Sequence, residues 1–406
     1  MKKSAYEKRV KKRITAKEHV LFAACSPGLK NLCLQEMLTL GFSNDQLTIN
    51  SGGIEFMGKP DQSILANLHL RTPLRILMRL EQFKATSFVQ LTKKIAAIDW
   101  AVHLPTNCDL KLNVTAHKSR LYHSDAIAQR IETIIMDQLN SQDGFVSKQR
   151  SCQTLFIRAD QDHFTLSLDT TGEPLFKRGI KKKVTQAPLR ENIAAAMLIW
   201  SHLCEDDILI DPMCGSGTFS LEAAMIKANV PPGFYRSFAF ENLPGFSQKT
   251  FQHFKKQAQK SIHLIFDKLI FASDVDDRAL AALKENIGDH NFTQLIDLQK
   301  KDFFSIMPDQ VSPDSIRPNS IKPNSIKLTK KGVIILNPPY GKRLDQNSSS
   351  QGFYKEIKKK VTSDFKGWRL AVILPSRNDM TQLDLKLNLK PVFHGGMDAF
   401  AGIGIL

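Results

Sequence analysis

The first stretch with the residue types for ligand chemistry is a glycine-rich turn, Asp211-Pro-Met-Cys-Gly-Ser-Gly217. It follows the apolar run 208–210 and precedes a helix-forming segment, and these three parts together make half of a nucleotide-binding α/β unit. Gly215 and Gly217 lack a Cβ, so the backbone can pass close to a ligand. Ser220 stands where the dinucleotide fingerprint has its third glycine. The turn therefore predicts a nucleotide-like ligand of another kind, and a tight turn without any ligand is the alternative.

The second stretch is Asn337-Pro-Pro-Tyr340, which follows the apolar strand candidate 333–336. Two prolines cannot continue a central strand, and their fixed φ angles hold their neighbours stiffly at its carboxyl end. Open α/β sheets bind ligands at that edge. The Asn337 side chain and the Pro338 carbonyl are two acceptors, and Tyr340 offers a ring, which suits an exocyclic amino group on a nucleobase. We predict that Asn337, Pro338, Pro339 and Tyr340 form the catalytic loop, because a simple strand-closing loop would explain only the prolines.

Together the glycine turn and the segment Asn337-Pro-Pro-Tyr-Gly-Lys-Arg-Leu344 resemble the THUMP-domain RNA guanine-N2 methyltransferases. The resemblance runs from about Val20 to the C-terminus, and is closest to the half of the bacterial 23S rRNA enzyme that methylates guanosine on N2. It implies a class I methyltransferase that uses S-adenosylmethionine (SAM) and transfers its methyl group to N2 of a guanosine. The preferred substrate that it implies is 23S rRNA. Three alternatives stay open: a tRNA guanine-N2 enzyme, a DNA adenine-N6 enzyme, and a non-catalytic RNA-binding assembly factor.

The resemblance also assigns residues to the cofactor. In the family, the segment corresponding to 186–192 and the glycine turn line the methionine part of SAM, an acid after the second strand binds the ribose, and an Asp after the third strand binds the adenine beside an apolar neighbour. The resulting set comprises Pro188, Leu189, Glu191, Asp211, Pro212, Cys214, Gly215, Ser216, Gly217, Thr218, Asp274, Val275, Asp302, Phe303 and Asn337.

Asp274 lies 57 residues beyond Gly217, whereas a dinucleotide fold places its acid after ~20. The long insert 229–267 explains the gap. Similar enzymes carry an insert here that covers the substrate side, and a packed surface loop is an equally good interpretation.

The chain has 56 Lys and Arg residues and only 40 Asp and Glu residues, which gives a net charge of +16. Such an excess of positive charge indicates a polyanionic partner. The basic residues gather in clusters, and RNA contacts are predicted for Lys177, Arg178, Lys181, Lys182, Lys183, Lys342 and Arg343. The six cysteines form no Cys-x-x-Cys pair, so we expect no metal site, no disulfide framework and a cytoplasmic location. No apolar run approaches the ~18 residues of a membrane span.

The order of strand and helix signals predicts an α/β catalytic domain behind an α+β RNA-binding domain. We expect a basic disordered arm at 1–18, a ferredoxin-like subdomain at 19–70, a THUMP domain at 71–170 and a basic hinge at 171–190. The Rossmann-like methyltransferase domain, 191–406, has room for a seven-stranded sheet that ends in a hairpin formed by 391–393 and 399–406. A pentad repeated three times at 313–327 predicts a surface loop without a catalytic role.

Overall fold

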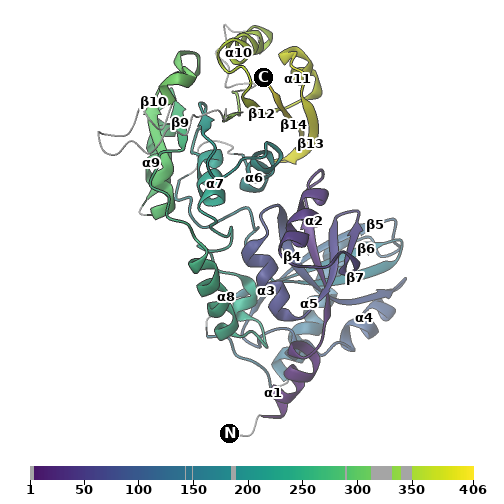
Figure 1. Cartoon of the computed structure of the whole chain (residues 1–406). Coiled ribbons are helices and arrows are strands. Elements are labelled where there is room, and N and C mark those ends of the chain that lie inside the picture. Colours follow the sequence, from purple (N-terminus) through teal and green to yellow (C-terminus); the bar gives the residue numbers. More distant parts are fainter. Residues whose placement is uncertain are drawn as a thin grey trace. The chain divides into compact units, whose positions relative to one another are not determined.

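The structure is a computed structural model that describes residues 4–141, 143–148, 150–183, 189–288, 290–311, 332–339 and 350–406. The chain forms two compact units (Figure 1). Unit 1 contains Met1–Cys25, Cys33–Leu175 and Arg236–Gln257, and unit 2 contains Ser26–Leu32, Phe176–Tyr235 and Ala258–Leu406. The repeat at 313–327 lies outside the described residues. Among the described residues, no helix combines the length and the apolar character needed to cross a membrane.

Unit 1 is built on a seven-stranded sheet in the order β2-β3-β1-β4-β7-β6-β5. Its strands are β1 (His19–Cys25), β2 (Leu47–Asn50), β3 (Gly53–Gly58), β4 (Pro73–Lys84), β5 (Asp109–His117), β6 (Cys152–Asp160) and β7 (His163–Asp169). The long strand β4 pairs with β1 through its first half and with β7 through its second half. The modules predicted at 19–70 and 71–170 therefore share one sheet.

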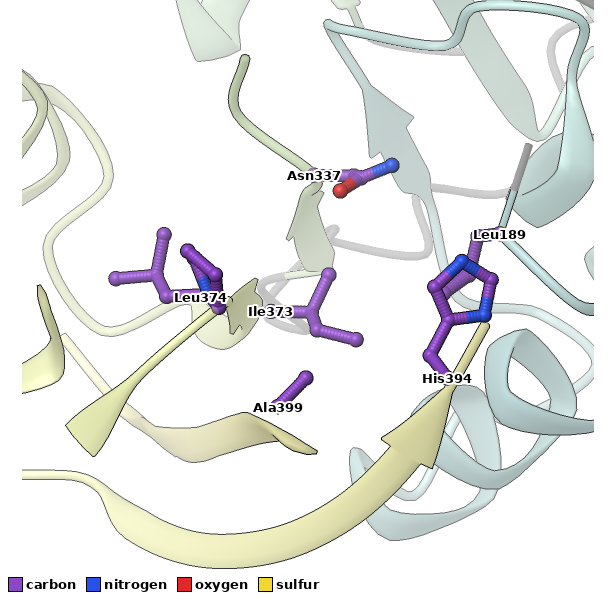
Figure 2. A pocket seen from close by; sticks show the side chains of 7 residues that line it. Leu189, Asn337, Ile373, Leu374, His394 and Ala399 are labelled. Carbon is purple, nitrogen blue, oxygen red and sulfur yellow. The ribbon is translucent and has the colours of Figure 1, made fainter. Parts of the chain in front are cut away.

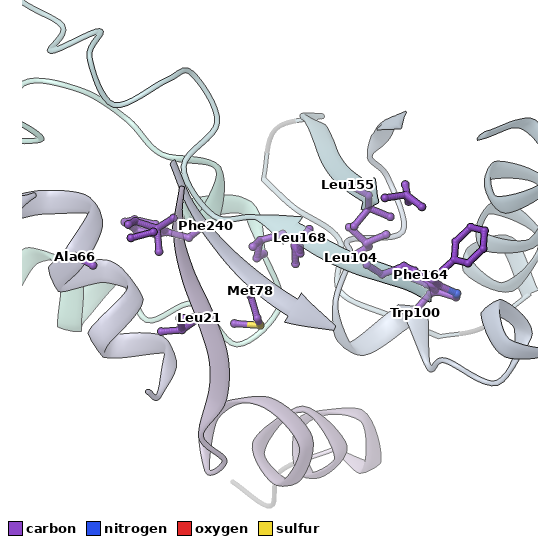
Figure 3. Packing of buried hydrophobic residues seen from close by; sticks show 14 of the residues in the cluster. Leu21, Ala66, Met78, Trp100, Leu104, Leu155, Phe164, Leu168 and Phe240 are labelled. Carbon is purple, nitrogen blue, oxygen red and sulfur yellow. The ribbon is translucent and has the colours of Figure 1, made fainter. Parts of the chain in front are cut away.

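Several helices of unit 1 accompany this sheet. They are α2 (Lys30–Thr39), α3 (Pro60–His69), α4 (Phe88–Ala96) and α5 (Ser124–Ser141). Apolar residues of the sheet and the helices form one core, in which Leu21, Trp100, Leu155 and Phe164 are fully buried (Figure 3). Strands β6 and β7 form an antiparallel hairpin in which Asp160 pairs with His163.

The N-terminal arm is ordered from Ser4 onward, which corrects the prediction of disorder. It consists of α1 (Ala5–Val10) and a π-helical turn, Lys11–Thr15. Val10 and Ile14 are buried, and the Tyr6 hydroxyl donates to the Ala101 carbonyl at 2.9 Å. Because Tyr6, Val10 and Ile14 are four residues apart, they lie on one helix face, and that apolar face holds the basic arm against unit 1.

The middle part of the long insert, Arg236–Gln257, belongs to unit 1 and not to unit 2. It carries a 3-10 turn, Ala239–Asn242, and α8 (Gln248–Lys260). Phe238, Phe240 and Phe251 are buried in the core of unit 1, and the Phe240 amide donates to the Thr170 carbonyl at 3.0 Å (Figure 3). This segment completes a hydrophobic core, as the interpretation of the insert as a packed loop predicts, and a cover over the substrate stays a prediction.

Unit 2 contains the predicted seven-stranded sheet, in the order β10-β9-β8-β11-β12-β14-β13. Its strands are β8 (Leu209–Asp211), β9 (Ile270–Asp274), β10 (Ile296–Lys300), β11 (Val333–Leu336), β12 (Arg369–Leu374), β13 (Asn388–His394) and β14 (Met397–Ile405). The first five strands in the sheet are parallel. The last two form the predicted antiparallel hairpin, with β14 also antiparallel to β12.

Helices cover both faces of this sheet (Figure 1). They are α6 (Glu191–Trp200), α7 (Thr218–Lys227), α9 (Asp277–Ile287), α10 (Ser350–Asp364) and α11 (Arg377–Leu383). In β11, Val333 and Ile335 belong to the core that includes residues of α6, α7 and α9, whereas Ile334 and Leu336 belong to the core that includes residues of α10 and α11. Alternate residues of a strand point to opposite faces, so a fully apolar strand is what a doubly covered sheet requires.

Candidate active site

The predicted site residues gather at one edge of the unit 2 sheet. Because β8, β9, β10 and β11 are parallel, their carboxyl ends lie at the same edge. Asp211 ends β8, Asp274 ends β9 and Asn337 directly follows β11. This edge of the sheet therefore brings together the glycine turn that begins at Asp211, the carboxylate of Asp274 and the Asn-Pro-Pro segment.

The glycine turn has the backbone that its glycines permit. Gly215 has φ +54° and Gly217 has φ +82°, both in the left-handed region that favours glycine. A Cβ on Gly217 would lie 2.2 Å from Leu283 Cδ1, so this glycine also allows α9 to pack against the turn. Gly217 is the N-cap of α7. The predicted cofactor residues around the turn are largely buried, namely Asp211, Pro212, Cys214, Ser216 and Thr218. Burial raises the pKa of the Cys214 thiol well above its ordinary value. Their side chains support the turn, and a ligand would meet its backbone.

Asp211 faces the first turn of α7. Its carboxylate is completely buried, and its Oδ2 accepts a hydrogen bond from Ser220 Oγ at 2.6 Å. Burial raises the pKa of this carboxyl to about 7, against a smaller opposing effect of the Ser220 hydrogen bonds. Ser220, which replaces the third glycine of the dinucleotide fingerprint, thus has a structural role here. Among the described residues, Oδ1 of Asp211 has no hydrogen-bond partner.

Asp274 joins the end of β9 to the glycine turn. Its Oδ2 accepts from the Gly215 amide at 2.9 Å, and its Oδ1 accepts from the Asp276 amide at 3.0 Å. A carboxylate has about four acceptor positions, so lone pairs remain for the two hydroxyls of a ribose. The next residue, Val275, is 62% exposed and offers an apolar surface beside them. These features fit the adenosine part of the cofactor.

Asp302 and Phe303, which follow β10, differ in how far a ligand could reach them. Asp302 is exposed, and its Oδ1 accepts from the Phe304 amide at 3.0 Å. The ring of Phe303 is 2% exposed and packs in the core with Tyr354 and Ile306. A ring buried there is not available to stack on adenine, so the predicted contact through Phe303 is wrong.

The basic hinge differs most from its prediction. Arg178 is buried, and its Nε lies 2.7 Å from Glu222 Oε1, with both side chains 1% exposed. Lys181 Nζ lies 2.8 Å from Glu191 Oε1. The predicted RNA contacts of Arg178 and Lys181 are therefore wrong, because acids from α7 and α6 already bind these two cations within unit 2.

Other basic residues of the hinge stay on the surface. Lys177, Lys182 and Lys183 are exposed, and Lys183 Nζ pairs with Glu285 at 2.6 Å. They remain candidates for phosphate contacts. Pro188, Tyr340, Lys342 and Arg343 lie outside the described residues.

Asn286 is a positioning residue that the sequence analysis did not identify. It is 1% exposed, its Oδ1 accepts from the amides of Lys182 and Lys183, and its Nδ2 donates to the carbonyls of Lys183 and Ser216. One amide side chain thus ties the hinge to the glycine turn. A single Asn within α9 carries no sequence signal for this role.

Asn337 lines a small pocket at the edge of the sheet. Figure 2 shows Asn337 and, from the end of β13, His394 lining the same pocket. The remaining lining residues are Leu189, Ile373, Leu374, Pro375 and Ala399. Asn337 is half-buried and Pro338 is buried. The pocket places one amide side chain, one imidazole and apolar side chains around a space beside the predicted cofactor segment. His394 was not predicted, because the glycine-rich end of the chain matches the family pattern poorly.

Two family descriptions match the chain. Residues 178–390 match the UPF0020 family, described as an RMKL-like methyltransferase domain. Residues 20–77 match an RlmL ferredoxin-like domain. The first match covers most of unit 2, and the second covers β1 to the first half of β4.

Relatives and solved structures resemble nearly the whole chain. A Synechocystis protein named as an RNA methyltransferase is 29% identical over 383 residues, which are 93% of this chain and 94% of that protein. The ribosomal RNA large subunit methyltransferase K/L of Cellvibrio japonicus is 28% identical over 390 residues, which are 93% of this chain and 50% of that protein. The chain therefore spans about half the length of that relative. A crystal structure described as a methyltransferase complexed with SAH superposes with a TM-score of 0.80 at 26% identity, covering 95% of this chain and 98% of the other.

Proposed function

Because the chain belongs to the family of RMKL-like methyltransferase domains, we propose that it transfers a methyl group from SAM to the exocyclic N2 of a guanosine in large-subunit ribosomal RNA. The family match supports methyl transfer, and relatives named as RNA methyltransferases support RNA as the acceptor. SAH, the product left when SAM has lost its methyl group, is bound in a similar solved structure. The ferredoxin-like match and the exposed lysines of the hinge support an RNA partner.

The observation that carries the acceptor chemistry is the position of Asn337. It follows β11, which pairs with β8, so the Asn-Pro-Pro segment lies beside the strand that leads into the glycine turn. It also lines a pocket together with Leu189, which belongs to the segment assigned to SAM. An acceptor for an amino group and a methyl donor would meet at this edge.

Each group of the site has a part in the proposed reaction. SAM supplies a methyl group on a sulfonium, which is already a good leaving group, so the protein mainly has to align the attacking nitrogen. The Asn337 side-chain oxygen and the Pro338 carbonyl would accept the two hydrogens of N2 and direct its lone pair toward the methyl carbon. The N2–carbon bond forms as the carbon–sulfur bond breaks, sulfur keeps the electron pair, and N2 releases one proton to solvent. Apolar Ile373 and Ala399 limit water around the reacting groups.

Replacement of Asn337 tests this chemistry. Asn337→Ala should lower turnover by ~10²–10³-fold, as loss of one preorganised polar group does, and should lower SAH affinity far less. Asn388→Ala, at an exposed Asn of β13, is the matched control and should keep full activity. Full activity of Asn337→Ala would mean that another group holds the amino group, and this assignment would then be abandoned.

The RNA target is tested by mass spectrometry of nucleosides from a strain that lacks the gene. Loss of N2-methylguanosine from large-subunit rRNA, restored by the wild-type gene and not by Asn337→Ala, is the expected result. Loss from tRNA alone would assign the alternative tRNA function. Loss of N6-methyladenine from DNA with unchanged N2-methylguanosine would overturn the proposed chemistry.

A further inference from the structure

Lys181 differs from the other lysines of the hinge in its surroundings. Its ammonium lies 2.8 Å from Glu191 Oε1 and donates to Thr218 Oγ1 at 2.7 Å. Its side chain is 8% exposed, whereas that of Lys183 is 64% exposed. Lys181 is therefore held inside unit 2, next to the glycine turn.

The location is electrostatically unfavourable for a lysine that has only a structural role. Thr218 is the first residue of α7, and the N-terminus of a helix carries a positive partial charge. A cation placed there is repelled, and burial of its charge adds a further cost. A cation and a helix N-terminus at the same point instead suit an anionic ligand, because both attract it.

An anion and a cation of the protein stand side by side here. Glu191 begins α6, and the backbone carbonyl of Leu189, two residues earlier, accepts a hydrogen bond from Thr218 Oγ1 at 3.4 Å. Asn286 holds the backbone of the next two hinge residues and that of Ser216. The ammonium and the carboxylate are thus fixed beside the turn, and together they complement a zwitterion.

We propose that Lys181 binds the α-carboxylate of the methionine part of SAM, while Glu191 binds its α-ammonium group. The inference rests on the proposed SAM-dependent function and adds a residue that the sequence analysis had assigned to RNA. Without the ligand, Lys181 and Glu191 pair with each other. When the ligand binds, its carboxylate takes the place of Glu191 beside Lys181, and its ammonium group takes the place of Lys181 beside Glu191. Each protein charge then keeps a counter-ion when the ligand binds.

Titration calorimetry with two probes tests this assignment. SAH carries the amino-acid end, and 5′-methylthioadenosine shares its adenosine and thioether but lacks that end. Lys181→Met should weaken SAH binding on the order of 10- to 100-fold, the loss of a hydrogen bond between charged groups, and leave 5′-methylthioadenosine binding unchanged. Lys182→Met, at the exposed neighbour, should change neither affinity.

The outcomes separate this inference from the proposed function. Equal weakening of both ligands by Lys181→Met would show a purely structural role, and unchanged SAH binding would show no role; either result overturns the assignment. If Lys181→Met does not fold, Lys181→Gln replaces it, because glutamine is polar and also lacks the charge; a selective loss of SAH affinity is then the expected result, and an equal loss for both probes or an unchanged SAH affinity is the contrary one. A wild-type protein that binds neither probe would instead refute the SAM-dependent function.

Discussion

Replacement of Asp274 tests the adenosine side of the site most directly. Asp274→Ala removes the carboxylate that accepts from the Gly215 amide at 2.9 Å and from the Asp276 amide at 3.0 Å. Both amides lie near the surface and can turn to water, so the direct cost to stability should be ~1 kcal/mol. A bound ribose would in addition lose its hydrogen bonds to a charged acceptor, worth ~1.5–3 kcal/mol, which is about 10- to 150-fold in affinity.

Calorimetry with SAH measures this loss, and thermal unfolding measures the stability. Asp274→Asn keeps the shape and one acceptor oxygen, so its affinity should lie between those of the wild type and the alanine variant. Asp276→Ala is the control, because Asp276 caps α9 by accepting from the Arg278 amide at 2.9 Å and is exposed. Unchanged SAH affinity in Asp274→Ala, or an equal loss in Asp276→Ala, would refute the assignment of Asp274 to the ribose.

Three further predictions concern buried groups. Arg178→Met should destabilise unit 2 by ~3–5 kcal/mol, because it leaves Glu222 buried without its cation; adding Glu222→Leu should restore much of the loss in denaturant unfolding, and no recovery would contradict the ion-pair explanation. Folded Asp211, with its pKa raised to about 7, keeps a proton that the unfolded carboxyl releases near pH ~3.9, so unfolding free energy should fall as the pH rises from about 4 to about 7. Asp211→Asn should remove that slope, and an unchanged slope would assign it to other groups. Phe240→Ala should lower the unfolding free energy of unit 1 by ~3–5 kcal/mol with unchanged SAH affinity, and an unaltered melting temperature would refute its role in that core.

Local patterns predicted the framework of unit 2 well. An apolar run followed by Asp211 and a glycine turn, and a second apolar run followed by Asn337, each identify a strand together with the edge at which it ends. The parallel sheet then brings these ends together, so the candidate site followed from strand ends alone. The last hairpin was also predicted, although His394 at its end was not.

Contacts between distant segments were the part that the sequence could not reveal. The hinge showed its positive charges, but the acids that bind them, Glu191 and Glu222, lie in two helices further along the chain. A cluster of lysines and arginines was therefore assigned to RNA although two of its members are internal. In the N-terminal arm, the prediction of disorder followed from the high charge alone and took no account of the spacing of Tyr6, Val10 and Ile14.

The return of Arg236–Gln257 to unit 1 has a consequence for synthesis of the protein. When the chain has been translated only as far as Leu175, the sheet of unit 1 is complete but its core lacks Phe240 and Phe251. At about 5–20 residues per second, the ribosome adds the missing segment roughly 4–16 s later. During that interval the nascent chain exposes apolar surface, the kind of surface that makes a folding intermediate prone to aggregate. A smaller part of unit 2, Phe176–Tyr235 with the glycine turn, is made before unit 1 can close. Unit 1 can therefore close only after the segment Phe176–Tyr235 of unit 2 has been made, and the rest of unit 2, Ala258–Leu406, follows it.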